Sequence, residues 1–158
     1  MNTDIHEVQI ACFRLGEDLY AVDIMRIKEI IRPQKLTSLP KSPPFVEGVL
    51  NLRGTVIPVI DLRKRFDFPA SSLDRNTRLL IVSVGKQLLG LAVDEVTEVL
   101  TLNSRDIKPP PQVVNGVSAE YLVGVCLAKE SLIMLLNLDT ILTDRESREL
   151  SAIAATRT

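Results

Sequence analysis

The sequence predicts a mainly β protein made of two repeated units, each a small barrel or sandwich, followed by a C-terminal helix. Short apolar runs rich in Val, Ile and Leu recur along the chain between turn residues, which is typical of small β barrels and sandwiches. The apolar fraction of 46% supplies ample core material, although only 4% of the residues are aromatic. The stretch 144–158 is polar and helix-prone, and we expect it to fray.

An internal duplication relates the two halves of the chain. Gly16 aligns with Gly85 at an offset of 69 residues (85 − 16), and Gly48 aligns with Gly124 at an offset of 76 (124 − 48). Chance alone can align apolar residues, but it explains the matched glycines and the matched glutamates less easily. The aligned positions are Leu19/Leu88, Val22/Leu91, Ile24/Val93, Ile27/Val96, Glu29/Glu98, Ile30/Val99, Val49/Val125, Val56/Leu132, Ile57/Ile133, Val59/Leu135, Asp61/Asn137 and Leu62/Leu138.

Each unit is expected to begin with a hairpin. In the first unit, the hairpin joins residues 8–15 to residues 19–24. Ile24, Ile27 and Ile31 follow at spacings that share one helical face, which predicts a short helical turn.

A Pro-rich loop and two further strands complete each unit. The loops are residues 39–44 in the first unit and 108–111 in the second, and the polar stretch 67–77 is the expected boundary between the units. Pro58 cannot donate a hydrogen bond to a ladder, so its strand is expected to lie at an edge or to carry a bulge there.

The segment 45–62, FVEGVLNLRGTVIPVIDL, is the most informative part of the chain. It predicts two short strands around a tight Arg53-Gly54 turn. Polar residues decorate the apolar pattern, and glycine allows a neighbouring backbone to approach closely. The polar residues are Glu47, Asn51, Arg53 and Asp61. Such a segment can act as a recognition surface made of a backbone edge and a few charged groups.

Composition argues against several other classes of function. The net charge of the 158 residues is −1 and no basic cluster stands out, which argues against a nucleic-acid surface. The sequence contains no run of about 18 apolar residues, so no membrane-spanning helix is expected. The first nine residues do not have the layout of a signal peptide. Cys12, Cys126 and the single His6 are too few for a metal site or for Cys-His catalysis, so the cysteines are interpreted as small buried hydrophobes. We therefore expect no enzymatic activity, no metal and no cofactor.

Several spaced motifs resemble the CheW family, the adaptor proteins of bacterial chemotaxis. Besides the segment 45–62, they are residues 16–24 with 27–30, the stretch 40–45, residues 91–94 with Val96 and Val99, and residues 121–125; together they span about residues 8–142. The resemblance implies one CheW-like domain over 1–158, built from two five-stranded SH3-like barrels side by side. We expect the barrels at about 14–75 and 76–143, with strand 7–13 joining the second, and a polar tail or helix at 144–158.

The resemblance also implies a function and its sites. It suggests an adaptor that links the cytoplasmic tip of methyl-accepting chemoreceptors to the regulatory domain of a CheA-like histidine kinase, in the cytoplasm at membrane receptor arrays. The implied receptor contacts are Ile27, Glu29, Gly48, Asn51, Arg53, Gly90 and Val96, and the implied kinase contacts are Gln112 and Val113. Some family members carry an aromatic residue at the kinase contact, which this chain lacks.

Three alternatives stay open at this point. Glu29 and Arg53 can form a surface salt bridge with no partner, which would stabilise the fold by roughly 0–1 kcal/mol. The same domain also serves parallel chemosensory pathways, such as type IV pilus motility or gene regulation. A small-molecule-binding barrel is the alternative from another class, although the sequence shows no convergent polar cluster.

Overall fold

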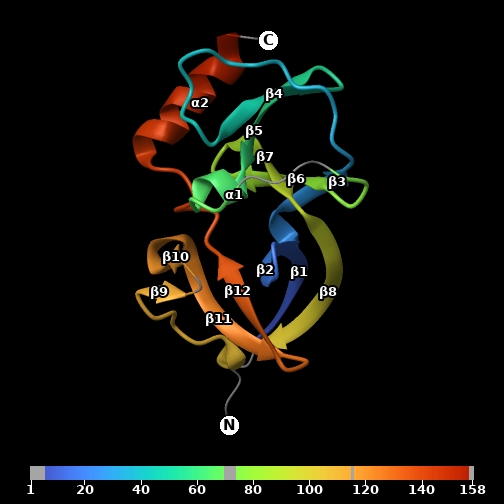
Figure 1. Cartoon of the computed structure of the whole chain (residues 1–158), viewed down its shortest axis with the longest axis vertical. Coiled ribbons are helices and arrows are strands. Elements are labelled where there is room, and N and C mark those ends of the chain that lie inside the picture. The colour runs from blue at the N-terminus through green and yellow to red at the C-terminus, as the bar shows by residue number, and fades with distance from the viewer. Residues whose placement is uncertain (1–5, 70–73, 115, 157–158) are drawn as a thin grey trace.

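The computed structural model describes residues 6–69, 74–114 and 116–156, and it has two five-stranded sheets, each forming one lobe of the molecule (Figure 1). The lower barrel contains β1 (Glu7–Leu15), β2 (Asp18–Asp23), β8 (Glu95–Asn103), β11 (Leu122–Ala128) and β12 (Ser131–Leu136), in the order β11-β12-β2-β1-β8. The upper barrel contains β3 (Ile27–Ile31), β4 (Val46–Leu52), β5 (Thr55–Asp61), β6 (Arg78–Val84) and β7 (Gln87–Val93), in the order β3-β6-β7-β5-β4.

Short elements complete the fold. They are the 3₁₀ turns η1 (Ile24–Arg26), η2 (Ser104–Asp106) and η3 (Ala119–Tyr121), the helices α1 (Leu62–Arg65) and α2 (Asp144–Thr156), and a two-stranded sheet of β9 (Val113–Val114) and β10 (Val117–Ser118). The predicted fold class, two small β barrels with short helical turns and a C-terminal helix, is confirmed.

Each barrel combines the hairpin of one repeat with three strands of the other. The lower barrel takes β1 and β2 from the first repeat but β8, β11 and β12 from the second, and the upper barrel shows the reverse arrangement. Equivalent strands occupy equivalent places in both sheets, including one parallel pair in each, β12 with β2 and β5 with β7. This exchange differs from the expected boundary between 14–75 and 76–143, because hydrogen bonds join β6 and β7 to β3–β5. Residues 70–73 of the expected boundary segment lie outside the described residues.

The predicted helical turn after the first hairpin is shorter than expected. It covers only Ile24–Arg26, where the Asp23 side chain caps the turn by accepting a hydrogen bond from the Met25 backbone N–H at 2.9 Å. Ile27 and Ile31 belong to β3, so the prediction that they lie on a helix is wrong. Their i, i+4 spacing fits a helix face, but pairing with β6 overrides this local signal.

Pro58 occupies an interior strand. Strand β5 has β4 on one side and β7 on the other, so the edge-strand alternative is wrong. The parallel ladder with β7 begins one residue later, at Val59, and a bulge in β4 lies between Val46 and Gly48. Proline is tolerated here because the β7 ladder does not reach it. The bulge expected in the strand of Pro58 lies instead in the neighbouring strand β4, opposite Val59 and Ile60.

The core is continuous between the barrels. One large cluster contains residues of both sheets, including Phe13 and Tyr20 of the lower barrel and Leu80 and Leu91 of the upper barrel. Burying this apolar surface stabilises the fold by about 25 cal/mol per Å². The barrels are therefore packed as one body rather than as two independent domains.

Both cysteines are free and buried in the smaller core cluster of the lower barrel. Burial raises the pKa of Cys12 to about 11 and also raises the pKa of Cys126. Because the thiolate is the reactive form, these side chains act as small hydrophobes, as the sequence predicted.

Helix α2 is docked rather than frayed over its described part. Thr143 and Glu146 form a capping box, in which each side chain accepts a hydrogen bond from the other residue's backbone N–H, at 2.8 and 3.1 Å. Leu150 is fully buried in the large core cluster, and Ile153 packs against that cluster. The expectation that the tail frays is therefore wrong over this stretch.

Candidate partner-binding surface

Glu29 and Arg53 form a bidentate ion pair on the surface of the upper barrel. The two hydrogen bonds join Arg53 Nη2 to Glu29 Oε2 at 2.6 Å and Arg53 Nη1 to Glu29 Oε1 at 3.3 Å. The pair connects β3 to the β4–β5 turn, and β3 and β4 are the two outer strands of this sheet. The ion pair thus spans the seam where the barrel closes.

The β4–β5 turn fixes how Arg53 is presented. Arg53 has a φ of 52°, which is a left-handed backbone conformation that few non-glycine residues adopt. Asn51 Oδ1 accepts a hydrogen bond from the Gly54 N–H at 2.8 Å, so the exposed Asn51 holds the turn. The side chain of Arg53 is 70% exposed and that of Glu29 is 34% exposed.

The ion pair changes the acidity of both groups. The hydrogen bond from Arg53 lowers the pKa of Glu29, and the hydrogen bond to Glu29 raises the pKa of Arg53. Both groups stay ionised near neutral pH, so the salt-bridge alternative is confirmed as a structural feature. Exposed pairs stabilise little, and the guanidinium remains open to a partner.

Gly48 and Gly90 lie beneath the surface. A Cβ on Gly48 would lie 2.5 Å from the Thr37 carbonyl oxygen, and the Thr37 segment is held by two backbone hydrogen bonds to Val49, both 2.9 Å. A Cβ on Gly90 would lie 3.1 Å from Val59 Cγ2. Since both glycines are buried, they shape the strands that carry the exposed residues and present no side chain to a partner.

Ile27 and Val96 are repeat-equivalent and half-buried. Both pack against the large core cluster that spans the barrels. In Figure 1 their strands, β3 and β8, lie along the same side of the molecule. The structure therefore brings the apolar and charged members of the predicted receptor set to one side.

The predicted kinase contacts lie elsewhere. Val113 belongs to the small β9–β10 hairpin and is 61% exposed. Gln112 is exposed, and its carbonyl accepts a hydrogen bond from the Ala119 N–H at 2.8 Å. In Figure 1 this hairpin lies on the side of the lower barrel opposite β8. The predicted receptor contacts and the predicted kinase contacts therefore lie on two separate surfaces.

A second surface ion pair was missed by the sequence reasoning. Lys129 Nζ donates a hydrogen bond to Glu98 Oε1 at 2.7 Å, between the β11–β12 turn and β8. The signal was available, because Lys129 follows Arg53 by the same 76 positions that separate the aligned glycines. Adding the 76-residue offset to the position of Arg53 gives Lys129.

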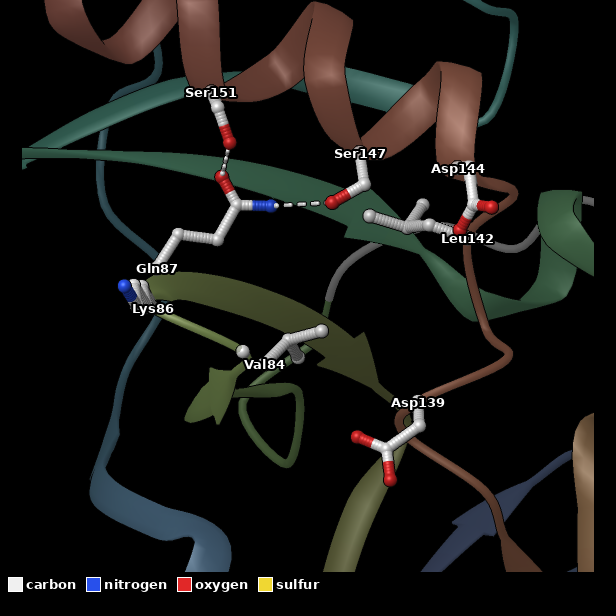
Figure 2. A pocket seen from close by; sticks show the side chains of 9 residues that line it. Val84, Lys86, Gln87, Asp139, Leu142, Asp144, Ser147 and Ser151 are labelled. Atoms are coloured by element: carbon white, nitrogen blue, oxygen red, sulfur yellow. Dashed lines mark hydrogen bonds between the residues drawn. The ribbon is translucent and has the colours of Figure 1, made fainter.

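One hollow of about 270 Å³ lies between the β6–β7 turn and helix α2 (Figure 2). Gln87 bridges it by donating to Ser147 at 3.3 Å and by accepting from Ser151 at 2.6 Å. The amide group of Gln87 is therefore hydrogen-bonded to α2 through both its nitrogen and its oxygen, and the hollow lies where α2 packs on the β6–β7 turn. Figure 2 also shows Asp139 at its rim, where the carboxylate is paired with Arg26 at 2.9 Å.

Within residues 6–69, 74–114 and 116–156, no helix is long and apolar enough to cross a membrane. No group of three or more His, Cys, Asp or Glu side chains in that part of the chain is placed to hold a metal ion.

Comparisons with known proteins identify the family. The CheW-like domain family matches residues 9–146. Chemotaxis protein CheW of Treponema pallidum is 34% identical over 155 residues, covering 96% of this chain and 91% of that protein. Protein FrzA of Myxococcus xanthus is 33% identical over 144 residues, covering 90% and 89%. The crystal structure of the scaffolding protein TtCheW from Thermoanaerobacter tengcongensis superposes with a TM-score of 0.83 at 33% identity, covering 89% of this chain and 91% of that one. The chain belongs to the family of CheW-like domain proteins.

Proposed function

We propose that this protein is a non-enzymatic adaptor that links methyl-accepting chemoreceptors to the regulatory domain of a CheA-like histidine kinase. The observation that carries the proposal is the match to proteins named chemotaxis protein CheW, which covers 96% and 85% of this chain in two relatives. In this role the protein works in the cytoplasm and is recruited to receptor arrays at the membrane.

The separation of the two surfaces supports an adaptor. The β3–β8 side, with Arg53 and Glu29, is assigned to the receptor, and the β9–β10 hairpin with Val113 is assigned to the kinase. These surfaces lie on different sides of the molecule, which supports simultaneous binding of both partners (Figure 1). Holding both partners together raises their effective concentration. Differential binding to receptor conformations would couple the receptor to kinase activity.

The receptor side is tested by reversing one charge. We expect Arg53→Glu to weaken binding of a receptor cytoplasmic fragment about tenfold, because a carboxylate replaces an exposed cation beside Glu29. Binding is measured by titration calorimetry, with circular dichroism to verify the fold. The matched control is Arg145→Glu, which reverses an 84%-exposed cation on α2 and should bind like the wild type. Unchanged binding by the Arg53 variant would remove Arg53 from the receptor surface.

A second candidate is an adaptor of a parallel chemosensory pathway, in pilus motility or gene regulation. The match to Protein FrzA supports this second candidate, because it shows a relative that is not named chemotaxis protein CheW. The two candidates differ in the kinase that is bound. Pull-downs with each CheA-like kinase of the same cell distinguish them.

A further inference from the structure

We propose that the Glu98–Lys129 ion pair of the lower barrel is a second half-site for the receptor, equivalent to Glu29–Arg53, so that a two-helix receptor tip contacts one pair with each helix. This inference rests on the proposed function and extends it to residues that the sequence resemblance does not include. The ligand is an antiparallel pair of helices with a carboxylate on each helix.

The two ion pairs occupy equivalent places in the two sheets. Each carboxylate lies on the outer strand that is equivalent in the two sheets, Glu29 on β3 and Glu98 on β8. Each cation lies in the hairpin turn after the opposite outer strand, β4 or β11. Arg53 and Lys129 even share the left-handed backbone conformation, with φ values of 52° and 51°. Each barrel therefore carries the same arrangement, an ion pair between an outer strand and a hairpin turn.

Each half-site has one strand on the same side of the molecule. Ile27 precedes Glu29, and its equivalent Val96 precedes Glu98, at the same spacing. Both apolar residues pack against the single cluster that joins the barrels. Strands β3 and β8 run along one side in Figure 1. A ligand lying along this side of both barrels would therefore meet one strand of each half-site.

In both ion pairs the cation is more exposed than the carboxylate. The cations are the more exposed members, with 70% of the Arg53 side chain and 69% of the Lys129 side chain accessible. The carboxylates are more recessed, at 34% for Glu29 and 39% for Glu98. The surface thus offers one outward cation on each half, and a ligand with one carboxylate on each half fits it.

The two half-sites are built from equivalent strands in the same order. An antiparallel pair of helices likewise offers two similar ligand elements side by side, so each helix can be matched to one half-site. Arg53 uses both terminal nitrogens on Glu29, whereas Lys129 forms one hydrogen bond to Glu98 and is a compact point charge. We therefore expect the lower half-site to accept a ligand carboxylate in a wider range of orientations than the upper one.

A purely structural explanation makes a different prediction. If the Glu98–Lys129 pair only closes the barrel seam, then exchanging the two charges should leave receptor binding unchanged. If Lys129 faces a receptor carboxylate, the exchange keeps the internal pair but presents the wrong charge outward. The double variant Glu98→Lys/Lys129→Glu separates these two cases.

The test uses the full chain and the cytoplasmic hairpin fragment of a methyl-accepting chemoreceptor from the same cell, in titration calorimetry. We expect about tenfold weaker binding for Lys129→Glu and for the charge-exchange variant, and near-wild-type binding for Lys129→Arg and for the control Arg145→Glu. Circular dichroism melting verifies that each variant folds.

The contradicting results are distinct from failure of the proposed function. Wild-type affinity in Lys129→Glu or in the charge-exchange variant, together with weakened binding in Arg53→Glu, would overturn the second half-site and leave the adaptor function intact. Absence of receptor binding by the wild-type protein would overturn the proposed function itself.

Discussion

Replacing Arg65 with alanine is expected to lower the free energy of unfolding by about 3–5 kcal/mol, the cost of breaking a buried ion pair. The Arg65 side chain is 9% exposed, and it forms two hydrogen bonds with Glu146, at 2.9 and 3.1 Å. Its Nε donates to the Ile141 carbonyl at 2.8 Å, and its guanidinium lies over the rings of Phe45 and Tyr121, 4.3 and 5.1 Å from their centroids.

Arg65 has this large effect because it joins three parts of the molecule. It lies on α1 of the upper barrel, Glu146 lies on α2, and Tyr121 lies on η3 beside the lower barrel. The substitution leaves the Ile141 carbonyl without this donor and removes two cation–π contacts.

Urea unfolding followed by circular dichroism measures the change, since the chain has no tryptophan. The control is Arg145→Ala, which removes an exposed i, i+4 pair and should cost at most about 0.5 kcal/mol. A loss below about 1 kcal/mol for the Arg65 variant would show that this residue does not hold the barrels together.

Replacing Gly48 with alanine is expected to cost about 2–4 kcal/mol, because backbone strain and a steric clash both contribute. Gly48 has a φ of 148°, which side-chain-bearing residues rarely adopt. Its Cβ would meet the Thr37 carbonyl oxygen at 2.5 Å, and that carbonyl is fixed by its hydrogen bond from the Val49 N–H. The clash therefore falls on backbone rather than on a flexible side chain.

Gly54→Ala is the matched control for this substitution. Gly54 also has a positive φ, of 91°, but a Cβ there would have no neighbour within 4 Å. Its cost measures backbone strain alone. If the Gly48 variant unfolds at the same urea concentration as the Gly54 variant, the close approach of the Thr37 segment is not a constraint.

Local and repeated features could be predicted from the sequence. The alignment of Gly48 with Gly124 anticipated a shared structural role, because each glycine admits a neighbouring backbone, at Thr37 and at Lys108. The matched residues Glu29 and Glu98 likewise predicted equivalent places. The Glu29–Arg53 bridge is one of the alternatives that the sequence leaves open, and the structure contains it.

Long-range features could not be predicted from the residues alone. The repeats exchange hairpins, and no local pattern distinguishes β6 pairing with β3 from β6 pairing with β8. The segment with Ile27 and Ile31 has helical spacing but becomes a strand through that pairing. Arg65 looks like an ordinary basic residue in a polar helix, and its partner Glu146 lies 81 positions away. Its importance appears only after the barrels are packed.

The most direct test of the account is whether the protein holds both partners at once. Titration calorimetry with the regulatory domain of the CheA-like kinase from the same cell should give saturable one-to-one binding. That binary complex should then bind the receptor fragment with undiminished affinity, because the β9–β10 hairpin and the β3–β8 side are separate surfaces. No binding to any such kinase domain, or mutual exclusion of kinase and receptor, would contradict the adaptor function.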